Sequence, residues 1–277
     1  MFTVCAELAA RDTITCLMLS SLSVFFPAYN DAPSLPSLIG KTFAVLEQHV
    51  EDYEVIAVND GSFDDTGAVL AELGQRYGPR MRVITHSQNR GYGGALRSGF
   101  QAATKEWVFY TDGDAQYDVA ELPRLLAEIR PGVGLVNGFK LERHDPLHRI
   151  WIGRVYNSFA RTLFRIRLSD IDCDYRLVRR DLLKDADLTS TSGTVCVELV
   201  RKLELTACGV MEVGVHHYPR LYGRSQFFRV RSLATTLQQL IRLHFRIVMV
   251  PVLSDCARFL RLGALLAGAA AESKTPE

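Results

Sequence analysis

Two carboxylates and a carboxamide at residues 112–116 are the clearest candidates for a functional site in this sequence. Asp112, Asp114 and Gln116 follow an apolar run, 107–110, that is short, aromatic and β-branched and is therefore predicted to be a buried strand. Ligands of open α/β sheets bind beyond the carboxyl ends of the strands. Two carboxylates this close repel each other unless a cation lies between them. Oxygen ligands of this kind suit Mg2+ or Mn2+, which keep positions open for substrate phosphates.

The same residues have a simpler interpretation. They fit a loop between a strand and a helix in which Asp114 or Asp118 is the N-cap of the helix. An isolated Asp-Gly-Asp tripeptide does not distinguish a metal site from such a loop. The surrounding chain has to decide between them.

Three other predicted strands end in polar loops of the same kind. The predicted strands that end near residues 27, 58, 86 and 110 are parallel, so their loops converge on one edge of the sheet. Asp60 is either a turn residue or an acceptor for the N–H of a nucleobase. Asp31 is either a polar loop residue or a ligand contact. This convergence carries more weight than any single motif.

The glycine-rich segment that begins at Gly91 resembles a dinucleotide-binding turn but lacks its third glycine, which would fall at Leu96. Two interpretations remain. The glycines form a turn that leads into a helix, or they give flexible backbone beside a phosphate or sugar, with Arg97 on the helix that follows.

The second half of the chain adds further candidate residues. Arg220 and Arg224 have the fork-shaped guanidinium that matches phosphate oxygens. Glu198, on a predicted helix, is either a surface charge or a general base. His216 and His217 follow a strand and are more typical of packed or surface side chains than of metal ligands, because no cysteine or carboxylate lies at metal-ligand spacing nearby.

Strands and helices alternate through the first half of the chain, which is typical of a doubly wound parallel sheet. Beyond residue 140 the alternation weakens, and the segment 175–178 is predicted to be an edge strand. We divide the chain into an N-terminal extension (1–20), an α/β domain (21–225) and a C-terminal amphipathic helical segment with a tail (226–277). The expected strands cover 22–27, 53–58, 81–85, 107–110, 133–137 and 210–218, and the expected helices cover 36–48, 64–77 with Asp64 as its cap, 95–103, 118–129, 147–166, 194–206 and 226–248.

Composition is that of a globular chain, with 48% hydrophobic and 23% charged residues in 277. The net charge is +1, but no acid lies between Asp145 and Asp170 or between Glu212 and Asp255, where arginines gather. Such basic stretches suit phosphates, an anionic membrane face or nucleic acid. The helix 226–248 either lies at an anionic membrane or packs on the domain.

Cysteine usage and hydropathy bear on location. The six cysteines include no C-x-x-C pair, and we expect no secretory signal, so they are predicted to be reduced thiols of a cytosolic protein. No uncharged apolar run reaches about 18 residues, so no membrane-spanning helix is expected.

Taken in order, these motifs resemble family 2 glycosyltransferases of the GT-A fold, in the dolichol-phosphate mannose synthase-like branch. The resemblance covers roughly residues 22–228, and the ordered set of motifs is more specific than its members. It rests on segments 27–30, 58–66, 89–99, 112–116, 172–176, 179–180 and 217–225. The implied fold is a GT-A (Rossmann-like), mostly parallel sheet flanked by helices, followed by C-terminal amphipathic helices.

The resemblance implies an inverting, metal-dependent transfer of a sugar from GDP-mannose or a UDP-sugar to a dolichyl or undecaprenyl phosphate. It places the enzyme peripherally on the cytoplasmic face of an anionic membrane, with a possible membrane-anchoring partner subunit. Many family members carry C-terminal spanning helices, which are not expected here, and most have glutamate where Asp31 stands.

Residue roles follow from the same resemblance. Asp112, Asp114 and Gln116 would hold Mg2+ or Mn2+ on the diphosphate. Asp172 and Arg176 would border the acceptor. The other residues would bind the donor and its phosphates: Pro27, Tyr29, Asp31, Asp60, Gly91 and Arg97 the nucleotide sugar, and Arg220, Arg224 and Ser225 the phosphates.

Chemistry separates the acceptor alternatives. A phosphate monoester has a second pKa of about 6, so at neutral pH it is largely ionised, is already a nucleophile and needs no strong base. A hydroxyl acceptor in polysaccharide or cell-envelope synthesis would need a base, for which Glu198 is the candidate. A non-enzymatic membrane or nucleic-acid binding module ranks last, since it would leave residues 112–116 unexplained; we expect no nucleic-acid partner.

Overall fold

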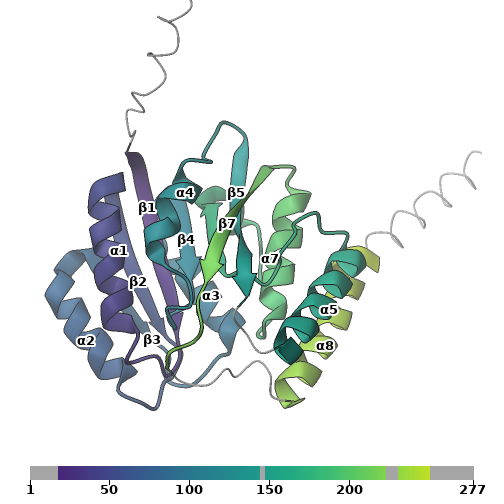
Figure 1. The fold of residues 1–277 in the computed structure, drawn as a ribbon, viewed down its shortest axis with the longest axis horizontal. Coiled ribbons are helices and arrows are strands. Elements are labelled where there is room, and N and C mark those ends of the chain that lie inside the picture. Colours follow the sequence, from purple (N-terminus) through teal and green to yellow (C-terminus); the bar gives the residue numbers. More distant parts are fainter. Residues whose placement is uncertain (1–17, 144–146, 223–229, 250–277) are drawn as a thin grey trace, which may run out of the picture.

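A single seven-stranded sheet organises the molecule. The computed structural model describes residues 18–143, 147–222 and 230–249 (Figure 1). The strand order is β3-β2-β1-β4-β6-β5-β7. The strands are β1 (Leu19–Ala28), β2 (Val50–Asn59), β3 (Met81–Thr85), β4 (Trp107–Thr111), β5 (Val133–Arg143), β6 (Tyr175–Arg179) and β7 (Gly209–His217).

Helices cover the sheet on both faces. They are α1 (Leu35–His49), α2 (Thr66–Tyr77), α3 (Tyr92–Ala102), α4 (Leu122–Leu126), α5 (Leu147–Phe164), α6 (Arg180–Lys184), α7 (Thr194–Leu205) and α8 (Val230–His244). Short 3-10 turns occupy Gly78–Arg80 and Val119–Glu121, and a π-helical turn, Phe245–Met249, continues α8.

One strand runs against the others. β6 is antiparallel to both β4 and β5, whereas the remaining pairs are parallel. The carboxyl ends of six strands and the start of β6 therefore meet at one edge of the sheet. The register Thr111↔Tyr175 brings the residues after β4 beside those before β6. The prediction of an edge strand at 175–178 is wrong, because β6 lies in the interior between β4 and β5.

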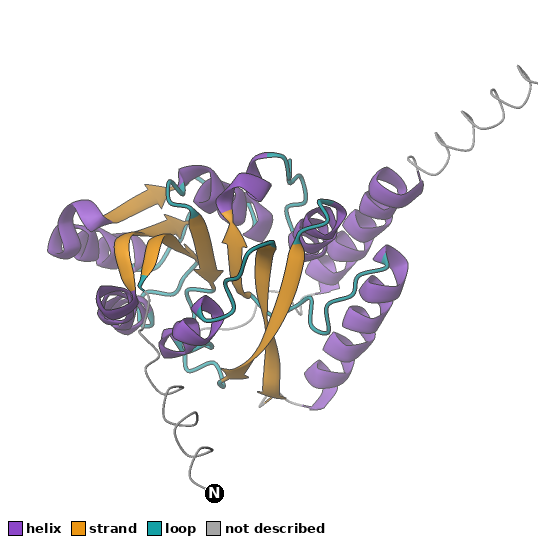
Figure 2. Cartoon of the chain, turned by 90° about the horizontal axis from the view of Figure 1, so that it is seen from above, coloured by secondary structure: helices purple, strands orange, loops and turns teal. Residues whose placement is uncertain are grey.

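Alternation along the strands divides the core into two layers. On β1, Val24 and Phe26 face the layer of α1, α2 and α4, whereas Phe25 faces α3, α7, α5 and α8. The helices α5 and α8 lie side by side at one end of the molecule in both views (Figures 1 and 2), and the rings of Phe164 and His244 are 5.6 Å apart. The doubly covered, mostly parallel sheet that the alternation predicts is confirmed.

Some predicted elements differ in extent. The single helix expected at 118–129 is a 3-10 turn followed by the short α4, since Asp118 caps the turn through Ala120 N and Pro123 opens the helix. The expected helix 226–248 is α8 with its π-helical turn, and its first residues lie outside the described ranges. Most of the predicted extension 1–20 also lies outside them, so the division into three parts stays a prediction. None of the helices described is long and apolar enough to cross a bilayer.

Candidate active site at the carboxyl edge of the sheet

Acidic side chains gather where β1, β4 and β6 meet. Asp112 directly follows β4, and its Oδ1 accepts a hydrogen bond of 2.8 Å from the hydroxyl of Tyr92. Burial raises the pKa of Asp112 well above its ordinary range, and the charges of Asp174 and Asp114 raise it further. Burial also raises the pKa of Asp114, against the opposing charge of Arg220. The cluster therefore holds like charges in surroundings that disfavour them.

Arg220 offsets part of this charge. Its guanidinium contacts the carboxylate of Asp114 and lies 4.0 Å from that of Asp31. Burial still raises the pKa of Asp31 to about 6, although the backbone N–H of Tyr29 donates to its Oδ2 at 2.9 Å. Within the described residues, the guanidinium of Arg220 leaves the pKa values of these carboxylates raised, and such a group of acids is chemically able to accept an additional cation.

The geometry of the Asp112–Asp114 turn explains the glycine between the two acids. Gly113 N donates to the carbonyl of Pro27 at 3.1 Å, and Ser34 Oγ donates to the carbonyl of Gly113 at 2.7 Å. A Cβ at position 113 would lie 2.9 Å from that Pro27 oxygen. The turn is thus fixed against the end of β1, which is where the resemblance expects Pro27 beside the donor.

Hard oxygen donors on one turn suit a divalent cation. The two carboxylates belong to Asp112 and Asp114, and Gln116 donates its backbone N–H to Asp114 Oδ1 at 3.0 Å. The Gln116 amide nitrogen donates to the carbonyl of Tyr218 at 3.0 Å, which leaves its side-chain oxygen for another partner. Within the described ranges, no three or more His, Cys, Asp or Glu side chains already form a complete metal site. A cation here would need oxygens from a substrate as well.

Asp60 lies deeper than a simple ligand contact. It is 3% exposed, and its Oδ1 contacts His86 Nδ1 at 2.6 Å and accepts from Arg90 N at 2.8 Å. His86 Nε2 in turn lies 2.9 Å from Ser98 Oγ. Sequence reasoning missed His86 and Ser98; the position of His86 directly after β3 was the available signal. The nucleobase contact of Asp60 stays a prediction.

The glycine-rich turn before α3 packs against protein. Gly91 has φ +78°, and a Cβ there would lie 2.5 Å from the carbonyl oxygen of Thr191. Gly93 N donates to the same oxygen at 3.1 Å, and Arg97 donates to the carbonyl of Ser190 at 2.7 Å. These glycines therefore make room for the segment 189–192. A contact of Gly91 or Arg97 with the nucleotide sugar stays a prediction.

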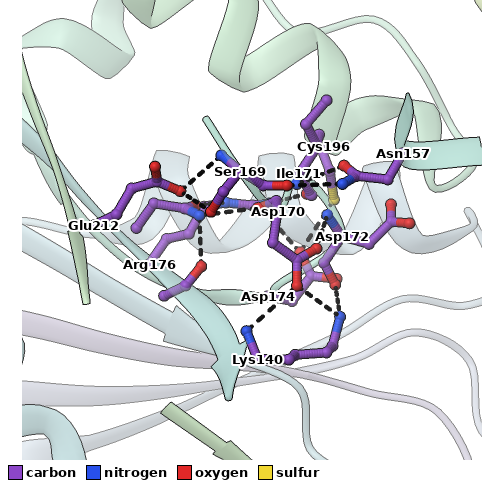
Figure 3. A network of polar contacts seen from close by, with 12 residues as sticks. Lys140, Asn157, Ser169, Asp170, Ile171, Asp172, Asp174, Arg176, Cys196 and Glu212 are labelled. Atoms are coloured by element: carbon purple, nitrogen blue, oxygen red, sulfur yellow. Dashed lines mark hydrogen bonds and ion pairs between the residues drawn. The ribbon is translucent and has the colours of Figure 1, made fainter. Parts of the chain in front are cut away.

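Residues before β6 form a buried polar network (Figure 3). Arg176 is fully buried, where it donates to Asn137 Oδ1 at 2.6 Å, to Asp174 Oδ1 at 2.8 Å and to the Tyr110 hydroxyl. We expect Arg176 to border the acceptor, but the structure places its guanidinium in the interior, where it orients Asp174. Sequence reasoning missed Asp174, whose charge acts on Asp112 and Asp114.

Asp172 lies in the same network. Burial raises its pKa to about 7, and the charge of Lys140 opposes that rise. Lys140 donates to the backbone carbonyl of Asp172 at 2.6 Å and lies 3.7 Å from the carboxylate of Asp170. A role of Asp172 at the acceptor stays a prediction.

Glu198 is a saturated buried carboxylate. It is 0% exposed and accepts from five donors: Thr189 N, Thr189 Oγ1, Ser190 N, Lys202 Nζ and the guanidinium of Arg246. Burial opposes its ionisation, but the hydrogen bonds from Lys202 and from Ser190 lower its pKa. This arrangement supports a structural anchor for the segment 189–192 more than a general base.

The remaining residues singled out from the sequence are Arg224, Ser225 and the two histidines, His216 and His217. Arg224 and Ser225 lie outside the described ranges. His217 is nearly buried, with its ring 5.1 Å from that of Tyr117, and His216 lies 3.0 Å from a carboxylate oxygen of Glu121. Both histidines thus have the packed or surface positions that we expect.

The sequence is similar to those of several curated proteins. It is 29% identical over 210 residues to an undecaprenyl-phosphate 4-deoxy-4-formamido-L-arabinose transferase of Enterobacter sp. (strain 638), which covers 76% of this chain and 63% of the relative. A protein of the same name from Pseudomonas fluorescens (strain SBW25) is 29% identical over 217 residues, 77% of this chain and 62% of that one. The chain thus spans a little over three fifths of the length of these relatives.

Similar solved structures share the fold. Glucosyl-3-phosphoglycerate synthase of Mycobacterium tuberculosis, in complex with Mn2+, UDP and glucosyl-3-phosphoglycerate, superposes with a TM-score of 0.59 at 21% identity, over 82% of this chain and 79% of that one. The same synthase with Mg2+ and UDP gives 0.60 at 20% identity over 82% and 79%. The expected GT-A fold is therefore confirmed. A sequence profile described as Glycosyl transferase family 2 matches residues 23–186, more than half of the chain, and the chain belongs to that family.

Proposed function

We propose that this protein transfers a sugar, with inversion, from a nucleotide diphosphate sugar to a polyprenyl phosphate, with a divalent cation on the donor. The observation that carries the proposal is the incompletely neutralised carboxylate cluster at the end of β4, on a chain of glycosyl transferase family 2. The names of the curated relatives, which are undecaprenyl-phosphate sugar transferases, support the acceptor class.

Asp112, Asp114 and Gln116 would hold Mg2+ or Mn2+, because their oxygens are the hard ligands that these ions prefer. When bound, the cation supplies positive charge to the diphosphate as it leaves. The neighbouring structures that contain Mn2+ or Mg2+ with UDP support this choice of ion. Arg220, which contacts Asp114, lies where it would also stabilise the leaving diphosphate, together with Arg224 and Ser225.

We assign binding of the nucleoside of the donor to the residues that follow β1 and β2. Asp60 would accept from the base through the oxygen that His86 does not hold, with Pro27, Tyr29 and Asp31 beside it. The fixed orientation of Asp60 supports this role, since a carboxylate held by His86 and by Arg90 N presents its second oxygen in one direction.

A phosphate acceptor fits the site better than a hydroxyl acceptor. A phosphate monoester is already largely ionised at neutral pH, since its second pKa is about 6. A hydroxyl would need a base, and the candidate Glu198 is buried with five donors on its two oxygens. A carboxylate in such surroundings is a poor base, which favours the polyprenyl phosphate.

Exposed apolar side chains on α5, on α8 and on the turn that continues α8 support attachment to a membrane, where such a lipid lies. We define this docking face by large apolar side chains that recur every four residues and are 47 to 66% exposed: Trp151, Val155, Phe159, Leu237, Ile241 and Phe245. Neither helix contains Asp or Glu, and both carry arginines. Apolar side chains beside cations suit the interface of an anionic leaflet. We assign the protein to the cytoplasmic face, with or without an anchoring partner subunit.

Ligand-induced stabilisation tests the donor. The full chain is titrated with GDP-mannose and a panel of UDP-sugars, with Mg2+, Mn2+ or EDTA, and unfolding is followed by thermal shift. A donor present at about 100 times its Kd should stabilise the native state by about 2.7 kcal/mol. The stabilising sugar nucleotide is then incubated with undecaprenyl phosphate in vesicles, and the product lipid is detected by mass spectrometry. Stabilisation that EDTA leaves unchanged would contradict the role of the metal, and transfer to a hydroxyl acceptor alone would contradict the acceptor.

A further inference from the structure

The segment 189–192 lies between the docking helix α8 and the glycine turn beside Asp112. We propose that Gln239 of α8 is a positioning residue that couples the position of α8 to the donor site, so that membrane docking and donor binding strengthen each other. This inference rests on the proposed function, because it concerns regulation of the same site.

Gln239 holds the segment through four hydrogen bonds. Its side-chain oxygen accepts from Thr191 N at 3.1 Å, from Ser192 N at 3.1 Å and from Ser192 Oγ at 3.0 Å. Its side-chain nitrogen donates to Thr191 Oγ1 at 2.8 Å. One carboxamide thus satisfies two loop N–H groups that would otherwise lose their partners, which ties 191–192 to α8.

On α8, the residues of the docking face and Gln239 lie on opposite sides of the helix. Each residue turns an α-helix by about 100°, so residues two apart point nearly opposite ways. Gln239 is two residues from Leu237 and two from Ile241, which are both exposed, whereas Leu240 and Leu243 are buried. A shift of α8 on contact with lipid would therefore move the side chain that holds 191–192.

The same segment continues to the acidic cluster. The carbonyl of Thr191 accepts from Gly93 N at 3.1 Å, and Gly91 leaves no room for a Cβ against it. Between these glycines, Tyr92 donates its hydroxyl to Asp112 Oδ1 at 2.8 Å. A continuous path of contacts thus runs from Gln239 through Thr191 and the glycine turn to Asp112.

A second contact from α8 strengthens the connection. Glu198 accepts from Ser190 N at 2.8 Å and from the guanidinium of Arg246, which lies in the turn that continues α8. The segment is thereby held at 189–190 through Glu198 and at 191–192 through Gln239. Two attachments restrict how far the segment can move independently of α8.

Coupling between two sites is reciprocal. If anionic vesicles tighten nucleotide binding by a given factor, the nucleotide must tighten vesicle binding by the same factor. We expect a factor of about 5 or more, the lower end of measured couplings. Loss of the Gln239 contacts should reduce the factor to below about twofold, since only the attachment through Glu198 remains, and should leave each separate binding event in place.

Hydrogen exchange tests the connection without any ligand. In Gln239→Met, which keeps the length of the side chain but removes the four bonds, amide exchange at 91–95 and 189–193 should rise about tenfold or more, while β4 stays protected. Gln239→Glu keeps the acceptor oxygens and should restore most of the protection. Gln238→Met is the matched control, because Gln238 is an exposed neighbour on the same helix. Unchanged exchange at 91–95 in Gln239→Met would overturn the proposal.

Binding measurements test the coupling itself. The affinities for UDP and GDP with Mg2+ are measured with and without vesicles of phosphatidylglycerol and phosphatidylcholine. The wild-type affinity should rise about fivefold with vesicles, whereas in Gln239→Met it should rise less than about twofold. Vesicle binding of Gln239→Met without nucleotide should stay within about twofold of the wild type. Equal wild-type affinities with and without vesicles would overturn the coupling. Failure to bind either nucleotide would instead contradict the proposed function, and the exchange experiment would still decide the role of Gln239.

Discussion

Glu198 is a fully buried carboxylate and Asp112 a half-buried one, and their surroundings are opposite. Five donors surround Glu198, including the side chains of Lys202 and Arg246, and its pKa is lowered in spite of burial. Asp112 accepts from the hydroxyl of Tyr92, with other carboxylates nearby, and burial raises its pKa well above the ordinary range. The two sites lie on the same molecule and are joined through the segment 189–192.

The difference shows that burial by itself does not identify a functional acid. Hydrogen-bond donors and cations compensate Glu198, so its charge contributes to stability. Among the described residues, Arg220 only partly compensates the cluster around Asp112, and we propose that a cation completes the compensation. Three substitutions test this contrast.

Asp112→Asn should have the largest effect. Transfer should fall by about 10³-fold or more, because the cation loses a charged ligand, while the free energy of unfolding stays unchanged or rises as one of several like charges is removed. Steady-state transfer and urea unfolding measure the two quantities. Asp185→Asn, at an exposed position, is the control and should change neither. Normal turnover in Asp112→Asn would refute the metal assignment.

Glu198→Gln should show the reverse pattern. Removing the charge takes away the anionic partner of Lys202 and Arg246 and should lower the free energy of unfolding by about 3 kcal/mol. Transfer per folded molecule should fall far less than in Asp112→Asn. Urea unfolding and single-turnover transfer at a temperature where the variant is folded make the comparison. Complete loss of transfer with unchanged stability would instead identify Glu198 as a base and favour a hydroxyl acceptor.

The pH dependence should show the smallest effect. Burial raises the pKa of Asp31 to about 6 in the folded state, above its ordinary value of 3.8. Ionisation is therefore harder in the folded state, so the penalty is absent below pH 3.8 and complete above pH 6. Asp31→Asn should become more stable relative to the wild type across this window, by up to about 3 kcal/mol. Urea unfolding at pH 4, 5 and 7 measures the difference, and a constant difference would contradict the raised pKa.

The sequence by itself determined the elements and the chemical type of the site. The predicted strand 81–85 coincides with β3, and the run that ends at Tyr110 is the core of β4, followed directly by Asp112 and Asp114. Apolar runs bounded by turn residues are local signals, so they can be read without the fold. The ordered motifs likewise indicated the family that the sequence profile confirms.

Only the tertiary structure decided how distant residues compensate one another. The insertion of β6 between β4 and β5, the burial of Arg176 and the ion pair of Arg246 with Glu198 depend on contacts between segments far apart in the chain. The need for glycine at position 91 also becomes clear only in the folded structure, where the carbonyl of Thr191 packs against it. Residue types and spacing specify which charges are available. Whether a charge is fully compensated is decided in part by non-local packing, because some of its partners, such as Arg246 for Glu198, come from elements far away in the sequence.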